Sequence, residues 1–150
     1  MATKQTGTID SKLKNTWQLV GRMYNMEASL HDITIPIAHF LLNIDSRKGS
    51  FASDIAPNLG TESTSLSRII LSLEEKKLIT RKEDKTDKRR IKLILTKKGQ
   101  NKKDIAKKMI TDFNKIIYAK IGNKKVNDFF ETIDKINEVA EERINYLKDK

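Results

Sequence analysis

The chain has 150 residues, a formal net charge of +10 and no cysteine. This length fits one domain with its own core, and the missing cysteine excludes disulfides, thiolate metal sites and thiol redox chemistry. No apolar run approaches the roughly 18 residues of a membrane span, and the first residues lack the apolar core of a signal peptide, so the sequence predicts a cytoplasmic protein.

Residues 9–30 are expected to form a helix that is apolar over more than half of its circumference. One face recurs at steps of three and four residues, and it comprises Ile9, Leu13, Trp17, Val20 and Tyr24. A second apolar set lies beside it, made of Leu19, Met23, Met26 and Leu30. A surface helix needs only one apolar stripe. The excess predicts contact with a second chain.

A helix over residues 35–44 is expected next. Thr34 suits its N-cap, and Pro36 falls in the first turn, where the missing N–H costs little. After a turn at residues 46–49, Ser50 or Ser53 is expected to cap a short helix that continues to residue 59.

Another helix is expected from about residue 62 to 76, after a turn that contains Gly60. Its inner face is apolar and consists of Leu66, Ile69, Ile70 and Leu73. The opposite face carries short hydroxyls and one arginine, at Ser63, Thr64, Ser67 and Arg68. Serine and threonine lower helix propensity relative to Glu and Lys. This face therefore indicates a binding role, with tolerated surface residues as the alternative.

Two β-prone runs, residues 78–81 and 91–95, flank a charged loop at residues 82–90. The second run alternates, with Ile91, Leu93 and Leu95 on one side of the strand. A lone hairpin is only marginally stable in water, so this one must pack on helices. A short helix, a tight turn, a second helix and a basic hairpin are typical of a winged helix-turn-helix.

The positive charge is concentrated in and after the hairpin. Residues 76–108 contain 15 Lys or Arg against four Asp or Glu, a surplus of 11 that accounts for the whole net charge of +10. A uniformly lysine-rich chain would spread its excess. This localised surplus predicts binding to a polyanion.

Two long helices are expected at the C-terminal end. Thr96 is predicted to cap a helix from residue 97 to about 121, ended by Gly122. The last helix repeats apolar positions at alternating steps of four and three, at Val126, Phe130, Ile133, Ala140, Ile144 and Leu147, with Asn137 in the seam. Both ends of the chain thus supply more apolar surface than a small domain can cover, which predicts a homodimer.

The chain resembles the MarR-type (multiple antibiotic resistance regulator) winged-helix transcription factors. Residues 73–81 are similar to the family's Leu-Glu-Glu-Lys-Gly-Leu-Val-x-Arg, residues 87–99 to its wing and to Leu-Thr-x-x-Gly, and residues 64–68 to its recognition helix. The resemblance implies a mainly α fold with a small β-hairpin wing. It assigns residues 34–96 to a winged helix-turn-helix, and residues 9–33 and 97–150 to dimerisation helices.

The implied function is sequence-specific binding of double-stranded DNA by a homodimeric repressor at a pseudo-palindrome. Expected major-groove residues are Ser63, Thr64, Ser67 and Arg68. Arg89 at the wing tip is expected in the minor groove, oriented by Asp87, because a narrow minor groove attracts arginine. Lys88 and Arg90 complete the expected wing, and Arg81 and Lys92 are expected to contact phosphates.

Some residues depart from the family pattern. Lys77 stands where a glycine is usual, which requires a left-handed lysine or an altered turn. Pro57 lies inside the first helix of the helix-turn-helix, where it removes an N–H and can kink or shorten that helix. Leu71 occupies an often polar place, and Glu62 replaces a usual serine-like cap.

The family also implies a small aromatic or phenolic effector that relieves repression. Trp17, Tyr24, His31 and His39 are the candidate pocket residues, although such residues are more often ordinary core or boundary positions. No cofactor is expected, and two histidines with scattered carboxylates define no metal site.

Three other classes of function compete with this one, and a pure protein-interaction module is the weakest because it leaves the surplus of 11 positive charges unexplained. The sequence lacks a Gly-rich phosphate loop, a His-Glu-x-x-His motif and a cysteine nucleophile, so it does not predict an enzyme. A non-sequence-specific nucleic-acid-binding or architectural protein is the alternative, because charge alone would serve it.

Overall fold

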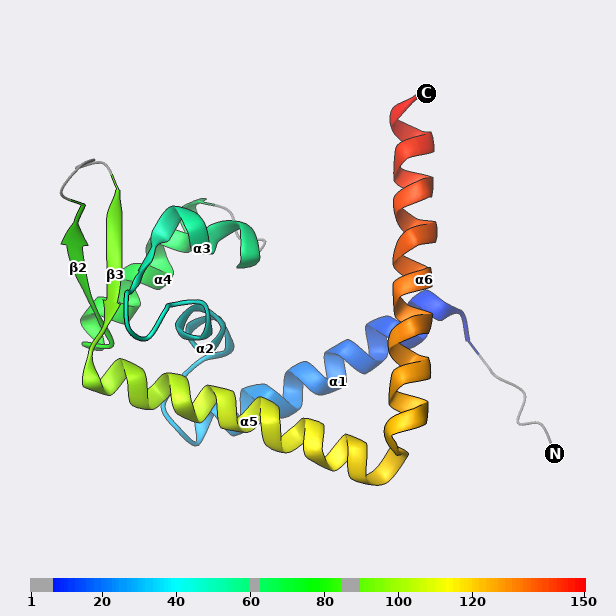
Figure 1. The fold of residues 1–150 in the computed structure, drawn as a ribbon, viewed down its shortest axis with the longest axis horizontal. Coiled ribbons are helices and arrows are strands. Elements are labelled where there is room, and N and C mark those ends of the chain that lie inside the picture. Colours follow the sequence, from blue (N-terminus) through cyan, green and yellow to red (C-terminus); the bar gives the residue numbers. More distant parts are fainter. Residues whose placement is uncertain (1–6, 60–62, 85–89) are drawn as a thin grey trace. The chain divides into compact units, whose positions relative to one another are not determined.

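The computed structural model describes residues 7–59, 63–84 and 90–150 (Figure 1). They form mainly helices with a small antiparallel sheet, as expected. The elements in chain order are α1 (Ile9–Ser29), α2 (Ile35–Leu42), β1 (Ser50–Phe51), α3 (Ala52–Leu59), α4 (Ser63–Glu75), β2 (Ile79–Glu83), β3 (Ile91–Leu95), α5 (Lys97–Ile121) and α6 (Asn123–Lys148). None of the helices within these ranges combines the length and hydropathy that crossing a bilayer requires.

The chain divides into two compact units, Met1–Met109 and Ile110–Lys150. In the first unit one hydrophobic core joins α1, α2, α3, α4, the sheet and the first half of α5. Its largest fully buried side chains are Phe40, Leu41, Ile44, Ile55, Leu73, Leu78 and Leu93. The predicted inner face of α4 contributes to this core, with Ile70 and Leu73 buried and Leu66 and Ile69 packed against them. That packing turns the opposite face of α4 toward solvent.

The sheet has the strand order β1-β3-β2 and is antiparallel throughout. β3 has the predicted bounds, but β2 continues to Glu83, so Lys82 and Glu83 pair with Lys92 and Ile91 and do not belong to the loop. The N–H of Asp84 adds one more bond, to the carbonyl of Arg90 at 3.2 Å. The wing is therefore longer and its loop shorter than the sequence predicted.

β1 was not predicted. It consists of two residues, Ser50 opposite Leu93 and Phe51 opposite Lys92. The expectation that Ser50 or Ser53 caps α3 was wrong, because Ser50 belongs to β1 and Ser53 lies within the helix. α3 continues through Pro57 to Leu59.

Helix ends elsewhere follow the sequence more closely. Thr34 is the N-cap of α2, although its hydroxyl makes no capping hydrogen bond. The hydroxyl of Thr96 accepts the N–H of Gly99 at 3.0 Å and so caps α5 as predicted. Lys77 has a φ of +57°, so of the two predicted possibilities the structure shows the left-handed lysine and not an altered turn.

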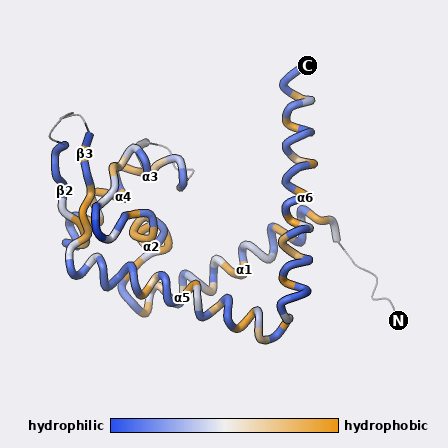
Figure 2. Tube along the Cα trace, in the orientation of Figure 1, coloured by the Kyte–Doolittle hydropathy of each residue, from blue (hydrophilic) through white to orange (hydrophobic). Residues whose placement is uncertain are grey.

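The second unit contains the end of α5 and all of α6. Val126 is buried, whereas many large apolar side chains along α6 are exposed, namely Phe129, Phe130, Val139, Ile144 and Leu147. In the first unit, α1 likewise exposes Ile9, Trp17, Leu19 and Met26, and Leu30 is exposed directly after this helix. Figure 2 shows hydrophobic and hydrophilic segments alternating along both helices. The homodimer stays a prediction, and these two faces are the surfaces on which it depends.

Candidate nucleic-acid interface

The solvent side of α4 is the first part of the candidate interface. Ser67 and Arg68 are exposed on it, and Leu71 extends the same side with 53% of its surface accessible. Ser63 and Thr64 lie in the first turn of α4, but their side chains fall outside the part that the structure describes. A helix with a short polar face of this kind fits the width of a major groove.

The face of the sheet that carries Lys82 and Lys92 is the second part. These two lysines lie directly opposite each other on β2 and β3, and Phe51 of β1 is the next partner in the same row. Like charges directly opposite each other destabilise a strand pair. The row of Phe51, Lys92 and Lys82 therefore combines an aromatic side chain with two cations that an external anion would stabilise.

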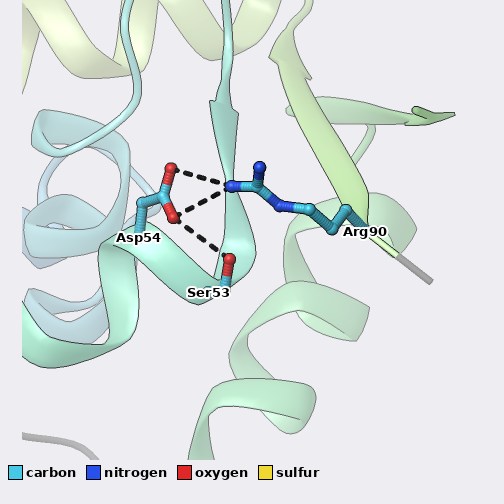
Figure 3. A network of polar contacts seen from close by, with 3 residues as sticks. All are labelled: Ser53, Asp54 and Arg90. Carbon is cyan, nitrogen blue, oxygen red and sulfur yellow. Dashed lines mark hydrogen bonds and ion pairs between the residues drawn. The ribbon is translucent and has the colours of Figure 1, made fainter. Parts of the chain in front are cut away.

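Arg90 stands at the end of this face, immediately before β3. Its Nη2 lies 3.2 Å from Oδ1 and 3.4 Å from Oδ2 of Asp54 on α3. The guanidinium carbon sits 3.8 Å from the centroid of the Phe51 ring, within cation–π range. Ser53 donates its hydroxyl to Oδ1 of Asp54 at 3.1 Å (Figure 3). The structure thus holds Arg90 between α3 and β1.

Arg81 does not belong to this surface. Its register partner is Leu93, so it occupies the face of the sheet that packs on the core, one residue out of phase with Lys82. Its Nε donates to Oε1 of Glu74 at 2.6 Å, and its Nη2 contacts Oε2 of the same carboxylate. The guanidinium is therefore engaged by a bidentate carboxylate, which opposes the predicted phosphate contact.

Three lysines of the basic segment serve the ends of other helices. Lys98 donates to the carbonyl of Lys76 after α4 at 3.0 Å, Lys102 to that of His31 after α1, and Lys103 to that of Ile44 after α2. Cations near helix C-termini satisfy carbonyls that lack an intrahelical partner. Part of the localised charge surplus is therefore structural, and this part lies at the start of α5.

Several residues predicted to bind DNA are not among those that the structure describes. Asp87, Lys88 and Arg89 lie outside the described residues, and so does Glu62 before α4. Their assigned roles stay predictions. Among the predicted phosphate contacts, Lys92 does lie on the basic face.

The predicted effector residues lie on α1, on α2 and in the segment between them. Trp17 is 70% exposed, His39 is exposed and His31 is half-buried. Tyr24 packs against the core, and its burial, followed by the charge of Glu27, raises the pKa of its hydroxyl. Within the described ranges no cluster of three or more His, Asp or Glu side chains is arranged for a metal ion.

Sequence reasoning missed Lys82, Asp54 and Phe51. The register of β2 against β3 places Lys82 beside Lys92, and β1 brings Phe51 and Asp54 to Arg90. Alternation along residues 79–83 contained a signal for Lys82, since a longer first strand would have placed it on the face opposite Arg81. No local pattern pointed to Asp54, which precedes Arg90 by 36 residues.

A family model matches residues 33–91, which cover the helix-turn-helix and most of the wing. The model is that of the MarR family, and this region of the chain is similar to that family. The residues that carry the resemblance and the sheet topology of a wing fall in this same region. No curated protein matches the chain in a pairwise comparison.

Solved structures of other proteins share the fold. An S. aureus MepR–DNA complex aligns with a TM-score of 0.80 at 20% identity, covering 89% of this chain and 98% of that one. Streptococcus pneumoniae FabT in complex with DNA gives 0.75 at 20% identity, covering 89% and 96%. The PcaV transcriptional regulator from Streptomyces coelicolor, with its natural ligand, gives 0.74 at 18% identity, covering 93% and 99%.

Proposed function

We propose that this chain is a homodimeric transcriptional repressor that binds a pseudo-palindromic site in double-stranded DNA. Residues 34–96 form its DNA-binding region, and residues 9–33 and 97–150 contribute the dimerisation helices. The observation that carries the proposal is the pairing of a short polar face on α4 with a basic face on the adjoining wing. A recognition helix and a wing of this kind occupy neighbouring grooves of B-form DNA.

Each residue class has its own role in the proposed complex. Ser67 and Arg68, with Ser63 and Thr64, read base edges in the major groove, since a bidentate arginine distinguishes guanine. Lys82, Arg90 and Lys92 neutralise phosphates, which positions the protein without specifying sequence. Arg89 of the wing enters the minor groove, oriented by Asp87, with Lys88 beside it. MepR and FabT, solved in complex with DNA, share this fold and support the assignment.

The exposed apolar faces of α1 and α6 support the dimer. An isolated chain would leave Trp17, Met26, Phe129 and Leu147 more than half exposed, and contiguous exposed apolar side chains mark protein–protein contacts. Light scattering should give about twice the chain mass of 17.2 kDa. A small aromatic or phenolic effector that releases DNA is part of the proposal, and PcaV with its natural ligand is the neighbour that favours it.

The proposed repressor acts in the cytoplasm and needs no catalytic step. Its function is tested by fluorescence anisotropy with a duplex from immediately upstream of its own gene, where an inverted repeat of about 16–20 base pairs is expected. Binding of about 6–10 phosphates predicts that affinity falls by roughly 10³–10⁵ between 50 and 200 mM salt.

Arg68→Ala should relax the sequence preference of DNA binding. Arg22→Ala on α1 makes the same charge change and should leave that preference intact. Equal affinity for the operator and for bulk DNA would favour the architectural alternative.

A further inference from the structure

The side chain of Arg90 is held by two elements that are distant from it in the sequence. Asp54 on α3 contacts Nη2 at 3.2 and 3.4 Å (Figure 3). The guanidinium carbon also lies 3.8 Å from the centroid of the Phe51 ring of β1. Ser53 in turn donates to Asp54 at 3.1 Å. A long flexible side chain is thereby kept in one position at the loop end of β3.

Stability alone gives a poor reason for this arrangement. The Arg90 and Asp54 side chains are 43% and 61% exposed, and exposed ion pairs contribute little to folding because solvent screens them. Arg90 uses only Nη2 in its contacts with Asp54. Within the described residues Nε and Nη1 have no hydrogen-bond partner. These N–H groups match the oxygens of a phosphate in geometry and charge.

The surroundings of Arg90 point to the same ligand. Alternation along β3 places Arg90 and Lys92 on one face of the sheet, and Lys92 lies opposite Lys82. The ammonium of Lys92 is 5.6 Å from the centroid of the same Phe51 ring that carries Arg90. The Phe51 ring thus contacts the cations of Arg90 and Lys92, and Lys82 lies beside them. A row of cations of this kind suits binding along a polyanionic backbone.

We infer that Asp54 and Phe51 are positioning residues that hold Arg90 so that Nε and Nη1 donate to a DNA phosphate beside the wing. This inference rests on the proposed function and adds to it two residues outside the helix-turn-helix reading face. The conformational freedom of Arg90 is already lost before DNA arrives, so binding need not remove it. Asp54 carries the wrong charge for DNA, and its contribution is made only through Arg90.

The test uses variants that keep the net charge. Asp54→Glu displaces the carboxylate, and Phe51→Leu removes the aromatic face while keeping an apolar side chain. Each should weaken operator binding about three- to tenfold and lower the slope of log affinity against log salt by up to about one, the change expected for one lost phosphate contact. Asp104→Glu on α5 is the matched carboxylate control, and Phe51→Tyr, which keeps the ring, should retain the wild-type slope.

A double-mutant cycle separates positioning from general structural damage. In an Arg90→Gln background, Asp54→Glu and Phe51→Leu should have no further effect on affinity or slope. Circular dichroism of each variant confirms that it is folded. Retention of the wild-type affinity and slope by both single variants overturns the inference, as does an undiminished effect in the Arg90→Gln background. Absence of salt-dependent binding by the wild-type protein instead overturns the proposed function itself.

Discussion

Arg81 on β2 is paired with Glu74 near the end of α4, with Nε 2.6 Å from Oε1 and Nη2 against Oε2. This pair joins α4 to β2 across the turn at residues 76–78. Arg81 and Lys82 are adjacent in the sequence, but their side chains lie on opposite faces of the sheet and have different roles. Arg81 braces the helix against the strand, and Lys82 belongs to the basic face.

This difference predicts unequal effects of removing two charges. Lys92→Gln should lower the salt slope of DNA binding by about one, because one phosphate contact is lost. Arg81→Gln makes the same charge change but should leave the slope within error and lower the free energy of unfolding by about 0.5–1 kcal/mol, as expected for a partly exposed pair. Anisotropy titrations at several salt concentrations and urea unfolding measure both effects. A lower salt slope for Arg81→Gln would show that Arg81 contacts a phosphate.

Gly99 packs directly on the backbone of Leu78, and this contact explains the glycine in the Leu-Thr-x-x-Gly motif. A Cβ on Gly99 would lie 1.9 Å from the carbonyl oxygen of Leu78. Gly99→Ala must therefore separate α5 from the turn before β2, at a cost of about 2 kcal/mol or more. Gly21 in α1 has nothing within 4 Å of the equivalent position, so Gly21→Ala should instead stabilise by about 0.5–1 kcal/mol. Urea denaturation compares the two variants. A loss of less than about 0.5 kcal/mol in the free energy of unfolding of Gly99→Ala would contradict the close packing of Gly99 on Leu78.

Lys77 adopts a left-handed backbone conformation with φ of +57°. Glycine adopts this conformation without the steric cost that a lysine meets, so Lys77→Gly should raise the free energy of unfolding by about 1 kcal/mol. Lys76→Gly removes the same charge one residue earlier, where φ is not positive, and should destabilise by a similar amount. Opposite signs in chemical denaturation are the expected result. Equal signs would show that the charge, and not the backbone, decides the effect.

Lys103 donates to the carbonyl of Ile44 and is partly buried, so its charge-assisted bond should contribute to folding. Lys103→Met should lower the free energy of unfolding by about 1.5–3 kcal/mol, the range for hydrogen bonds that involve a charged group. Lys97 is exposed in the first turn of α5, and Lys97→Met should change stability by less than about 0.5 kcal/mol. Thermal unfolding of both variants measures the two changes in stability. Equal stabilities of Lys103→Met and Lys97→Met would show that Lys103 has no structural role.

The elements that the sequence predicted well are those with a local pattern. Alternation from Ile91 to Leu95 gave both ends of β3, and the Thr96 cap with Gly122 gave both ends of α5. β1 has only two residues, too few for any periodicity, and it exists because Leu93 and Lys92 pair with it from a distant part of the chain. Long-range pairing of this kind leaves no signal in a single sequence.

The same limit applies to the site. The sequence located the polar face of α4 and the concentration of charge, because residue type and helical spacing are local properties. It could not divide the charges by role. The pairing of Arg81 with Glu74 depends on the strand register, so the sequence could not distinguish Arg81 from the residues predicted to contact phosphates. The carbonyl partners of Lys98, Lys102 and Lys103 likewise depend on where other helices end.

Sequence-specific recognition of DNA is tested by a selection experiment. The protein is used to enrich binding sites from a pool of random duplexes, and the affinities for enriched and scrambled duplexes are then compared at one fixed salt concentration. We expect an inverted repeat with half-sites about 10–10.5 base pairs apart, bound at least about 10³-fold more tightly than the scrambled duplex. No enriched motif, with affinities equal within about threefold, would contradict it.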